Sequence, residues 1–181
     1  MSHYRYFVLE LCAASLDKLF LLDGDAEKYK GPTLPPDSDV LLQLAEGLQY
    51  IHSNKLIHRD IKPGNVLISV DHKSQTAAVK WADFGLSRPI NDRGTYQITT
   101  IAGTNNWMAP ELLKQMTIEN KTELRGDVMS DIFAEGLVFA YYLGRGVHPY
   151  GSSEKEIKSN LKTDNPFHLE GELLFLAYYK F

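Results

Sequence analysis

The sequence predicts a mainly helical α+β domain with one short β-hairpin near its middle. Residues 37–52 and 128–143 have the length and apolar spacing of helices. Two short apolar runs, residues 66–69 and 77–82, lie between these helices and are separated by polar turn residues, as in a hairpin. A chain of 181 residues is long enough to bury one sizeable core.

The first third of the chain predicts a strand, a short helix, a loop and a long helix. Residues 6–11 are mostly apolar, which predicts a buried strand. Residues 13–22 have helical spacing, whereas residues 23–36 contain the glycines and prolines typical of a loop. Asp37 or Ser38 is expected to cap the long helix that follows. Its apolar stripe consists of Val40, Leu41, Leu44, Leu48 and Ile51.

The remaining elements follow the predicted hairpin. Residues 83–111 are rich in Thr, Arg and Gly, so we expect irregular structure there. The helix at residues 128–143 is apolar nearly all round, which predicts that it forms the buried centre of the domain. A shorter helix is expected at residues 153–161.

Charge and composition narrow the class of protein. The formal net charge is −4, which argues against a general binder of nucleic acid or of lipid surfaces. The only cysteine, Cys12, cannot form an internal disulfide. No apolar run approaches the roughly 20 residues of a membrane span, and the first residues do not form a signal peptide. We therefore expect a cytoplasmic domain without a membrane span and without direct contact to nucleic acid.

The run His-Arg-Asp-Ile-Lys-Pro-Gly-Asn at residues 58–65 and the later Asp-Phe-Gly carry the chemistry. Phosphoryl transfer requires an oriented hydroxyl, bridging metal ions and neutralised charge. Asp60 could accept the proton of a hydroxyl, and Lys62 could reach a phosphate as a compact point charge. Asn65 and Asp83 offer the hard oxygen ligands that suit Mg²⁺. The predicted hairpin joins the two runs and would return them to the same end.

Each of these residues also has a simpler interpretation. A lone His-Arg-Asp is commonly a surface turn with an ion pair, and a lone Asp-Phe-Gly is commonly a turn with one aromatic ring packed inward. His58 as a zinc ligand is disfavoured because no Cys or His neighbour has metal-binding spacing. Cys12 is more typical of a small buried apolar residue than of a nucleophile. The functional interpretation rests on the occurrence of the motifs together and in order.

The ordered motifs resemble the signature set of eukaryotic protein kinases, which continues with Ala-Pro-Glu, here at residues 109–111. The flanking sequence resembles the Ire family of endoplasmic-reticulum stress sensors, which join a kinase to a ribonuclease. The stretches that carry this second resemblance are residues 9–16, 103–111, 130–139 and 148–151. The resemblance extends to about Leu161 and implies a protein-kinase-like fold, mainly its α-helical C-terminal lobe with the small lobe missing.

The resemblance implies a site for ATP and Mg²⁺. Backbone groups of Glu10, Leu11 and Cys12 would bind adenine at the hinge, with Leu67 as an apolar floor beneath the ring. The other positions that would contact ATP are Lys62, Pro63, Gly64, Asn65 and Asp83. The last two of these would also hold the Mg²⁺ ions.

The resemblance further implies which residues do the catalysis and which support it. Asp60 and Lys62 would be the catalytic pair, and Thr104 would bridge them, which favours Ser or Thr over Tyr as the acceptor. Arg59 would pair with a phosphate on the activation segment. Asp131 would hold the backbone of the catalytic loop from the central helix.

A third group of residues is expected to act in structure or regulation. His58 would support the catalytic loop from the core, and Phe84 would pack behind the metal loop. Glu111 would pair with a later arginine, but the resemblance assigns no arginine of this sequence to that role. Thr99 and Thr100 are the expected phosphorylation sites, although a hydroxyl-rich loop is also typical of a solvated linker.

The resemblance divides the chain into three parts. Residues 1–13 would form the last strand of the small lobe and the hinge, and residues 14–162 a partial C-terminal lobe. Residues 163–181 match nothing firmly and are left as an uncertain tail. The sequence has no Gly-rich phosphate loop, strand lysine or helix glutamate. Because catalysis needs all three, we expect this chain to be inactive alone.

Three hypotheses about function follow. The chain is a fragment of an active Ser/Thr kinase, a non-catalytic regulatory fragment, or a nucleotide-sensing pseudokinase. The intact Asp60, Lys62, Asn65 and Asp83 favour the first. Its partner would then be a protein substrate with Ser or Thr, including a second copy phosphorylated in trans. The full-length parent would be a homodimer at the cytosolic face of the endoplasmic-reticulum membrane.

Overall fold

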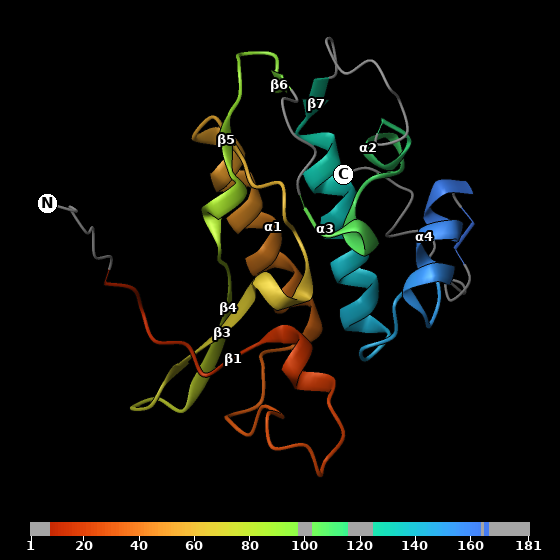
Figure 1. The fold of residues 1–181 in the computed structure, drawn as a ribbon. Helices are drawn as coiled ribbons and strands as arrows, with labels where there is room; N and C mark the ends of the chain where they lie inside the picture. Colours follow the sequence, from red (N-terminus) through yellow and green to blue (C-terminus); the bar gives the residue numbers. More distant parts are fainter. Residues whose placement is uncertain (1–7, 98–102, 116–124, 164, 167–181) are drawn as a thin grey trace, which may run out of the picture.

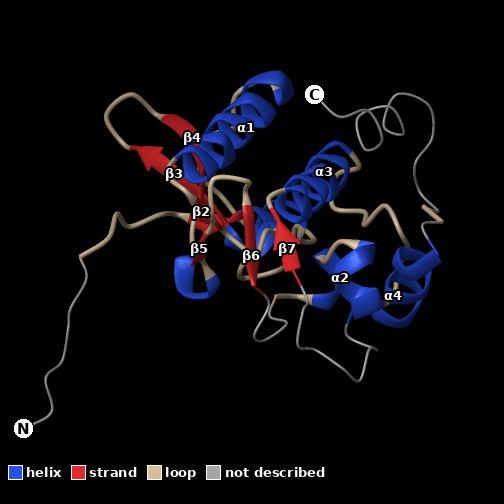
Figure 2. Ribbon diagram, turned by 90° about the horizontal axis from the view of Figure 1, so that it is seen from above, coloured by secondary structure: helices blue, strands red, loops and turns tan. Residues whose placement is uncertain are grey.

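The computed structural model describes residues 8–97, 103–115, 125–163 and 165–166. Its helices are α1 (Asp37–Ser53), α2 (Pro110–Gln115), α3 (Met129–Leu143) and α4 (Glu154–Thr163). Helix α3 runs through the middle of the described part, with α1 on one side and α2 and α4 on the other (Figure 1). The view from above in Figure 2 shows the same arrangement, with the β-hairpin beside α1.

All strands in the described residues pair antiparallel. Strands β1 (Ala14–Ser15), β3 (Val66–Asp71) and β4 (Thr76–Trp81) form a three-stranded sheet in the order β1-β3-β4. The other pairs are β2 (Leu56–Ile57) with β5 (Arg88–Pro89), and β6 (Thr95–Gln97) with β7 (Arg125–Asp127). Short 3-10 helices span Leu16–Phe20, Pro63–Asn65, Phe84–Leu86 and Asn105–Trp107.

Helix α1 packs against the hairpin through its predicted apolar stripe. Val40, Leu44, Leu48 and Ile51 are buried, and Leu41 packs at the edge of the same cluster. The indole of Trp81 donates a hydrogen bond to the Leu44 carbonyl at 2.9 Å. A Cβ at Gly47 would lie 3.1 Å from the Trp81 ring, so a glycine here permits the close approach. The predictions of this helix and of the hairpin are confirmed.

Helix α3 separates two apolar clusters, which explains why it is apolar nearly all round. Ala134, Val138 and Phe139 join the cluster formed with α1 and the hairpin. Leu137 joins a second cluster with Leu112, Leu113, Ile157 and Leu161 of α2 and α4. The prediction of a central buried helix is therefore confirmed. Among the described residues, no helix is both long enough and apolar enough to cross a membrane.

The segment before α1 differs from the prediction. Residues 8–13 form no strand, and Val8, Leu9 and Leu11 are exposed, because no described strand pairs with them there. Residues 13–22 form strand β1 and a 3-10 helix rather than an α-helix. The reason is pairing with a strand distant in sequence, since Ala13 N–H donates to the Ile68 carbonyl at 2.8 Å and Ala14 lies opposite Ile68.

Two local predictions were also wrong. Pro36, not Asp37 or Ser38, occupies the position before α1, and no side chain caps that end. The described parts of residues 83–111 are not irregular throughout, because they contain β5, β6 and the start of α2. Short strands such as β6 leave little sequence signal, since pairing with β7 rather than local propensity stabilises them.

Candidate active site

The catalytic loop is anchored on the carboxylate of Asp131, which is buried near the start of α3. Its Oδ2 accepts the N–H of His58 at 2.8 Å, and its Oδ1 accepts the N–H of Arg59 at 2.9 Å. The His52 ring of α1 contributes Nε2, 2.9 Å from Oδ2. One buried acceptor therefore ties α1, α3 and the loop together.

His58 is fully buried and uses both ring nitrogens. Its Nδ1 accepts the N–H of Asp60 at 3.3 Å, so Nε2 must donate to the Ala82 carbonyl 2.9 Å away. These two bonds leave no lone pair for a metal ion, and they set the proton on Nε2. His58 thereby fixes the amide of Asp60 and connects the catalytic loop to the end of β4.

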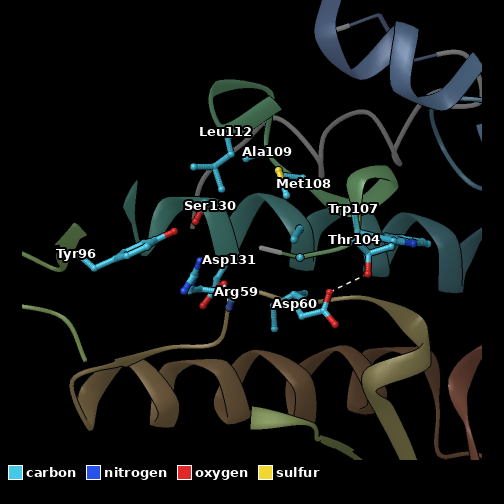
Figure 3. A pocket seen from close by; sticks show the side chains of 13 residues that line it. Arg59, Asp60, Tyr96, Thr104, Trp107, Met108, Ala109, Leu112, Ser130 and Asp131 are labelled. Carbon is cyan, nitrogen blue, oxygen red and sulfur yellow. Dashed lines mark hydrogen bonds between the residues drawn. The ribbon is translucent and has the colours of Figure 1, made fainter. Parts of the chain in front are cut away.

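The side chain of Asp60 lies within a set of hydrogen-bond donors, and Figure 3 shows the bond from one of them, Thr104. Its Oδ1 accepts from the Thr104 hydroxyl at 2.8 Å, and its Oδ2 lies 2.7 Å from Lys62 Nζ and 2.9 Å from Asn65 Nδ2. Lys62 Nζ also donates to Thr104 at 2.8 Å, so Thr104 bridges the two charged groups. Burial opposes ionisation of Asp60, but the bonds from Lys62, Thr104 and Asn65 outweigh it and lower the pKa of this carboxyl.

The donor Thr104 is itself held in place by its neighbours. Its carbonyl accepts the N–H of Trp107 at 2.9 Å, and the Trp107 ring lies 4.6 Å from the ring of His148. His148 Nδ1 accepts the N–H of Tyr150 at 3.1 Å, so its Nε2 donates to the Asn106 carbonyl at 2.9 Å. The loop between α3 and α4 therefore supports the segment that contacts Asp60.

The hairpin brings the second carboxylate to the catalytic loop. Ala82 N–H donates to the Asn65 carbonyl at 2.9 Å, which places Asp83 directly beside the loop. Asp83 has φ +63°, its side chain is exposed, and its Oδ1 accepts the N–H of Gly85 at 3.2 Å. The Asn65 amide nitrogen is bonded to Asp60, which leaves the Asn65 side-chain oxygen for a cation.

These two side chains fit Mg²⁺, which takes few protein oxygens and keeps several waters. Among the described residues, no cluster of three or more His, Cys, Asp and Glu could form a full protein cage for a metal. Pro63 begins the 3-10 helix that carries Asn65, and Gly64 makes its middle turn. The Phe84 ring lies 5.1 Å from His58 and stays 48% exposed, so it packs only partly behind the metal loop.

The expected adenine site is only partly formed by the described residues. Glu10 and Leu11 are exposed and Cys12 is half-buried, while Leu67 lies in β3 opposite Ser15. The Glu10 carboxylate contacts Lys80 Nζ at 2.6 Å and the Ser69 hydroxyl, and the Lys80 bond is the main reason that the pKa of Glu10 is lowered. Burial raises the pKa of the Cys12 thiol, which makes it a poor nucleophile.

The structure describes only some of the expected regulatory residues. Thr99 and Thr100 lie outside the described residues. The guanidinium of Arg59 lies over the Tyr96 ring, 5.1 Å from its centroid, and Arg59 Nη1 donates to the Leu86 carbonyl at 3.4 Å. Glu111 is exposed near the start of α2, and none of the ion pairs found among the described residues includes it.

A small hollow, open to solvent, lies between the catalytic loop and the segment that leads into α2 (Figure 3). Its polar lining includes Arg59, Asp60, Thr104, Ser130 and Asp131, and its apolar lining includes Met108, Ala109 and Leu112. No hinge residue lines it. The hollow is therefore separate from the expected adenine site.

The sequence analysis missed two polar residues at this centre. His52 follows Leu48 by four residues, so a polar side chain on the buried face of α1 was the available signal. Glu135 is a buried acid on α3, one helical turn after Asp131. Burial is the main reason, and the Asp131 charge a further one, that the pKa of Glu135 is raised to about 8.

Comparison with known proteins finds similarity to protein kinases along most of the chain. The protein kinase domain family matches residues 1–173. The chain is 32% identical to the serine/threonine-protein kinase/endoribonuclease ireA of Aspergillus fumigatus, over 98% of this chain and 17% of that protein. It is 37% identical to the human serine/threonine-protein kinase/endoribonuclease IRE2, over 94% of this chain and 18% of that protein. It is 45% identical to the serine/threonine-protein kinase pakH of Dictyostelium discoideum, over 68% of this chain and 22% of that protein. The chain thus spans only a minor part of each relative.

Proposed function

From the premise that this chain belongs to the protein kinase family, as a serine/threonine kinase, we propose that it supplies the catalytic loop for phosphoryl transfer from ATP to protein Ser or Thr. The observation that carries this proposal is the position of Asp60. It is a buried carboxylate kept ionised by Lys62, Thr104 and Asn65. An ionised carboxylate with a fixed amide is suited to accept a hydrogen bond, and then a proton, from a substrate hydroxyl.

Lys62 has a second role in this proposal. Its Nζ contacts both Asp60 and Thr104, and its side chain is 27% exposed, so it can also reach an incoming phosphate. A positive charge at this point stabilises the negative charge that spreads over the transferred group. Thr104 holds Lys62 close to Asp60, and the resemblance to Ser/Thr kinases implies that this pair favours a Ser or Thr hydroxyl as the acceptor.

Asn65 and Asp83 would hold Mg²⁺. The ion, when bound, neutralises charge on the phosphates of ATP. Asn65 and Asp83 would contribute two oxygens to it at the junction of the catalytic loop and the hairpin, which the Ala82–Asn65 hydrogen bond holds together. His58 keeps this junction together through the Ala82 carbonyl.

The proposal divides the chain into the hinge at residues 1–13, a partial C-terminal lobe at residues 14–162 and an unassigned tail at residues 163–181. Glu10, Leu11, Cys12 and Leu67 would contact adenine. The Gly-rich loop, the lysine and the glutamate that complete the ATP clamp would come from residues that precede this sequence. The 181 residues alone would then lack normal activity.

The names of two relatives join a kinase to an endoribonuclease. We therefore infer that the parent protein is an Ire-like sensor of the unfolded-protein response, which acts as a homodimer at the cytosolic face of the endoplasmic reticulum. Phosphate on Thr99 or Thr100 would then pair with Arg59 and order the activation segment. Mass spectrometry of a complete kinase after incubation with ATP tests the proposed phosphorylation. The absence of phosphate between Ser87 and Thr100 would contradict it.

A second candidate is a non-catalytic regulatory fragment, and one observation favours it. Val8, Leu9 and Leu11 are almost fully exposed, so the described hinge presents an apolar surface that a partner could cover. A purified chain that binds the small lobe of a relative without gaining phosphoryl transfer would support this candidate over the first.

The experiment that tests the first candidate joins this chain to the preceding kinase segment of the human relative and measures phosphate transfer to a Ser/Thr substrate. Asp60→Asn should lower kcat roughly a hundredfold to ten-thousandfold because it removes the proton acceptor. Asp39→Asn, the same change at an exposed position on α1, is the matched control. Normal turnover by the Asp60→Asn protein would overturn the role proposed for Asp60.

A further inference from the structure

The backbone of the catalytic loop is held in an unfavourable conformation next to Asp60. Arg59 has φ +72°, in the left-handed region that residues with a side chain rarely adopt. Such a conformation persists only when surrounding contacts fix it. Asp131 fixes the N–H of Arg59, as described above, and a second contact fixes its side chain.

The second contact is the ring of Tyr96, which packs closely against a glycine on the neighbouring strand. Tyr96 is 8% exposed, and its ring lies 5.1 Å from the Arg59 guanidinium (Figure 3). On strand β7, Gly126 lies directly opposite Tyr96. A Cβ at Gly126 would lie between 2.4 and 2.6 Å from atoms of the Tyr96 ring, so only a glycine leaves room for the ring there.

The strand that carries Tyr96 is fixed on its other side as well. The Asn91 side-chain oxygen accepts the N–H groups of Arg93 and Thr95, each at 3.0 Å. The Gly94 carbonyl accepts the N–H of Val128 at 3.1 Å, which joins this turn to the end of β7. The ring is therefore positioned by backbone contacts on both sides, not by a mobile side chain alone.

We propose that Tyr96 is a positioning residue of the active site, which orders the catalytic loop by holding the Arg59 side chain against the activation segment. This inference rests on the proposed function, because the order of Arg59 would affect activity only through the neighbouring Asp60. A cation over an aromatic face is attracted by the ring quadrupole, most strongly where water is excluded. The ring thus gives the loop a basal order that does not depend on phosphate at Thr99 or Thr100.

The test measures amide hydrogen exchange in the 181-residue chain and therefore requires no kinase activity. Tyr96→Leu should accelerate exchange of the Arg59 and His58 amides roughly tenfold, because local opening becomes easier. Tyr96→Phe keeps the ring and loses only the hydroxyl, so it should accelerate exchange less than Tyr96→Leu does. Tyr29→Leu is the matched control, because Tyr29 is similarly buried, its side chain also lies close to a glycine, Gly31, and it does not line the hollow that Arg59 and Tyr96 line.

Two results would overturn the proposal: unchanged exchange in the Tyr96→Leu chain, or equal acceleration in the Tyr29→Leu chain. Arg59→Gln gives a second variant in case Tyr96→Leu does not fold. It should accelerate His58 exchange by a similar factor, because it removes the cation that contacts the Tyr96 ring. If the exchange results are as expected but the chain joined to a small lobe transfers no phosphate, the proposed function is contradicted and the proposal about the Tyr96 contact is not.

Discussion

The catalytic loop and the hinge segment are held in opposite ways. Asp60 and His58 are buried, and their contacts come from α3, the end of the hairpin, the segment around Thr104 and the catalytic loop itself. The hinge residues Val8, Leu9 and Leu11 are exposed, and Glu10 makes only surface contacts with Lys80 and Ser69. The difference teaches that the residues expected to act on the acceptor hydroxyl are held by contacts within the described residues, whereas those expected to contact adenine are mostly exposed.

The largest expected effect comes from breaking the anchor of the catalytic loop. Asp131→Asn replaces one acceptor oxygen by an NH₂ group that faces an N–H donor. We expect the free energy of unfolding to fall by about 3 kcal/mol, since a buried donor loses its partner. Chemical denaturation measures this loss. Asp39→Asn is the exposed control, and an equal loss in both proteins would show that Asp131 is not a special anchor.

The metal junction should show the next largest effect. In the chain joined to a small lobe, Asp83→Asn should lower kcat/KM roughly a hundredfold because it removes the anionic ligand for Mg²⁺. Asn65→Ala should weaken activity less, since it removes a neutral ligand. Titration of activity with Mg²⁺ separates the two. A magnesium dependence in the Asp83→Asn protein equal to that of the unchanged protein would contradict the role proposed for Asp83.

Glu135 predicts a pH dependence of the anchored half. The folded protein keeps a proton on Glu135 up to about pH 8, whereas the unfolded chain loses it near 4.5. Between these values the native state binds more protons, so stability falls as pH rises, by at most about 1.4 kcal/mol per pH unit. Glu135→Gln should remove this slope between pH 5.5 and 7.5 in denaturant unfolding. A slope that persists in the Glu135→Gln protein would exclude Glu135 as its source, and Glu46→Gln on the exposed face of α1 is the control.

The smallest effect is expected at the hinge. Lys80→Ala removes an exposed ion pair to Glu10, and such pairs are screened by solvent. We expect no measurable change in the thermal unfolding midpoint. A clear decrease would mean that the hinge is fixed more firmly than its exposure indicates, and the contrast between the two halves would weaken.

Local patterns in the sequence predicted the parts that depend on local periodicity. The stripe on α1, the hairpin and the apolar α3 follow from spacing alone, because each side chain buries a face set by its own element. Residues 8–11 look like a buried strand, yet a strand also needs a partner, which a local pattern does not reveal. The contact between Tyr96 and Gly126 was missed for the same reason, since it joins two three-residue strands that are far apart in the chain.

The candidate site was predictable to a different degree. The chemistry of Asp60, Lys62, Asn65 and Asp83 followed from residue types in ordered motifs, whereas the place of Thr104 came from the family resemblance. The structure adds the geometry that makes Thr104 a bridge. His52 and Glu135 carried a detectable signal, because each is a polar residue on an apolar face. The contact of the Arg59 guanidinium with the Tyr96 ring is encoded by no motif.

The most direct test of the difference between the catalytic loop and the hinge segment is a measurement of phosphate transfer. Labelled ATP and a Ser/Thr protein substrate are incubated with equal concentrations of two proteins. One is the 181-residue chain, and the other is the same chain joined to the preceding kinase segment of the human relative. We expect the joined protein to transfer phosphate and the chain alone to reach less than about one hundredth of that rate, because positioning of ATP is lost. An equal rate from the chain alone would contradict the account, as would a joined protein that folds, binds ATP and transfers no phosphate.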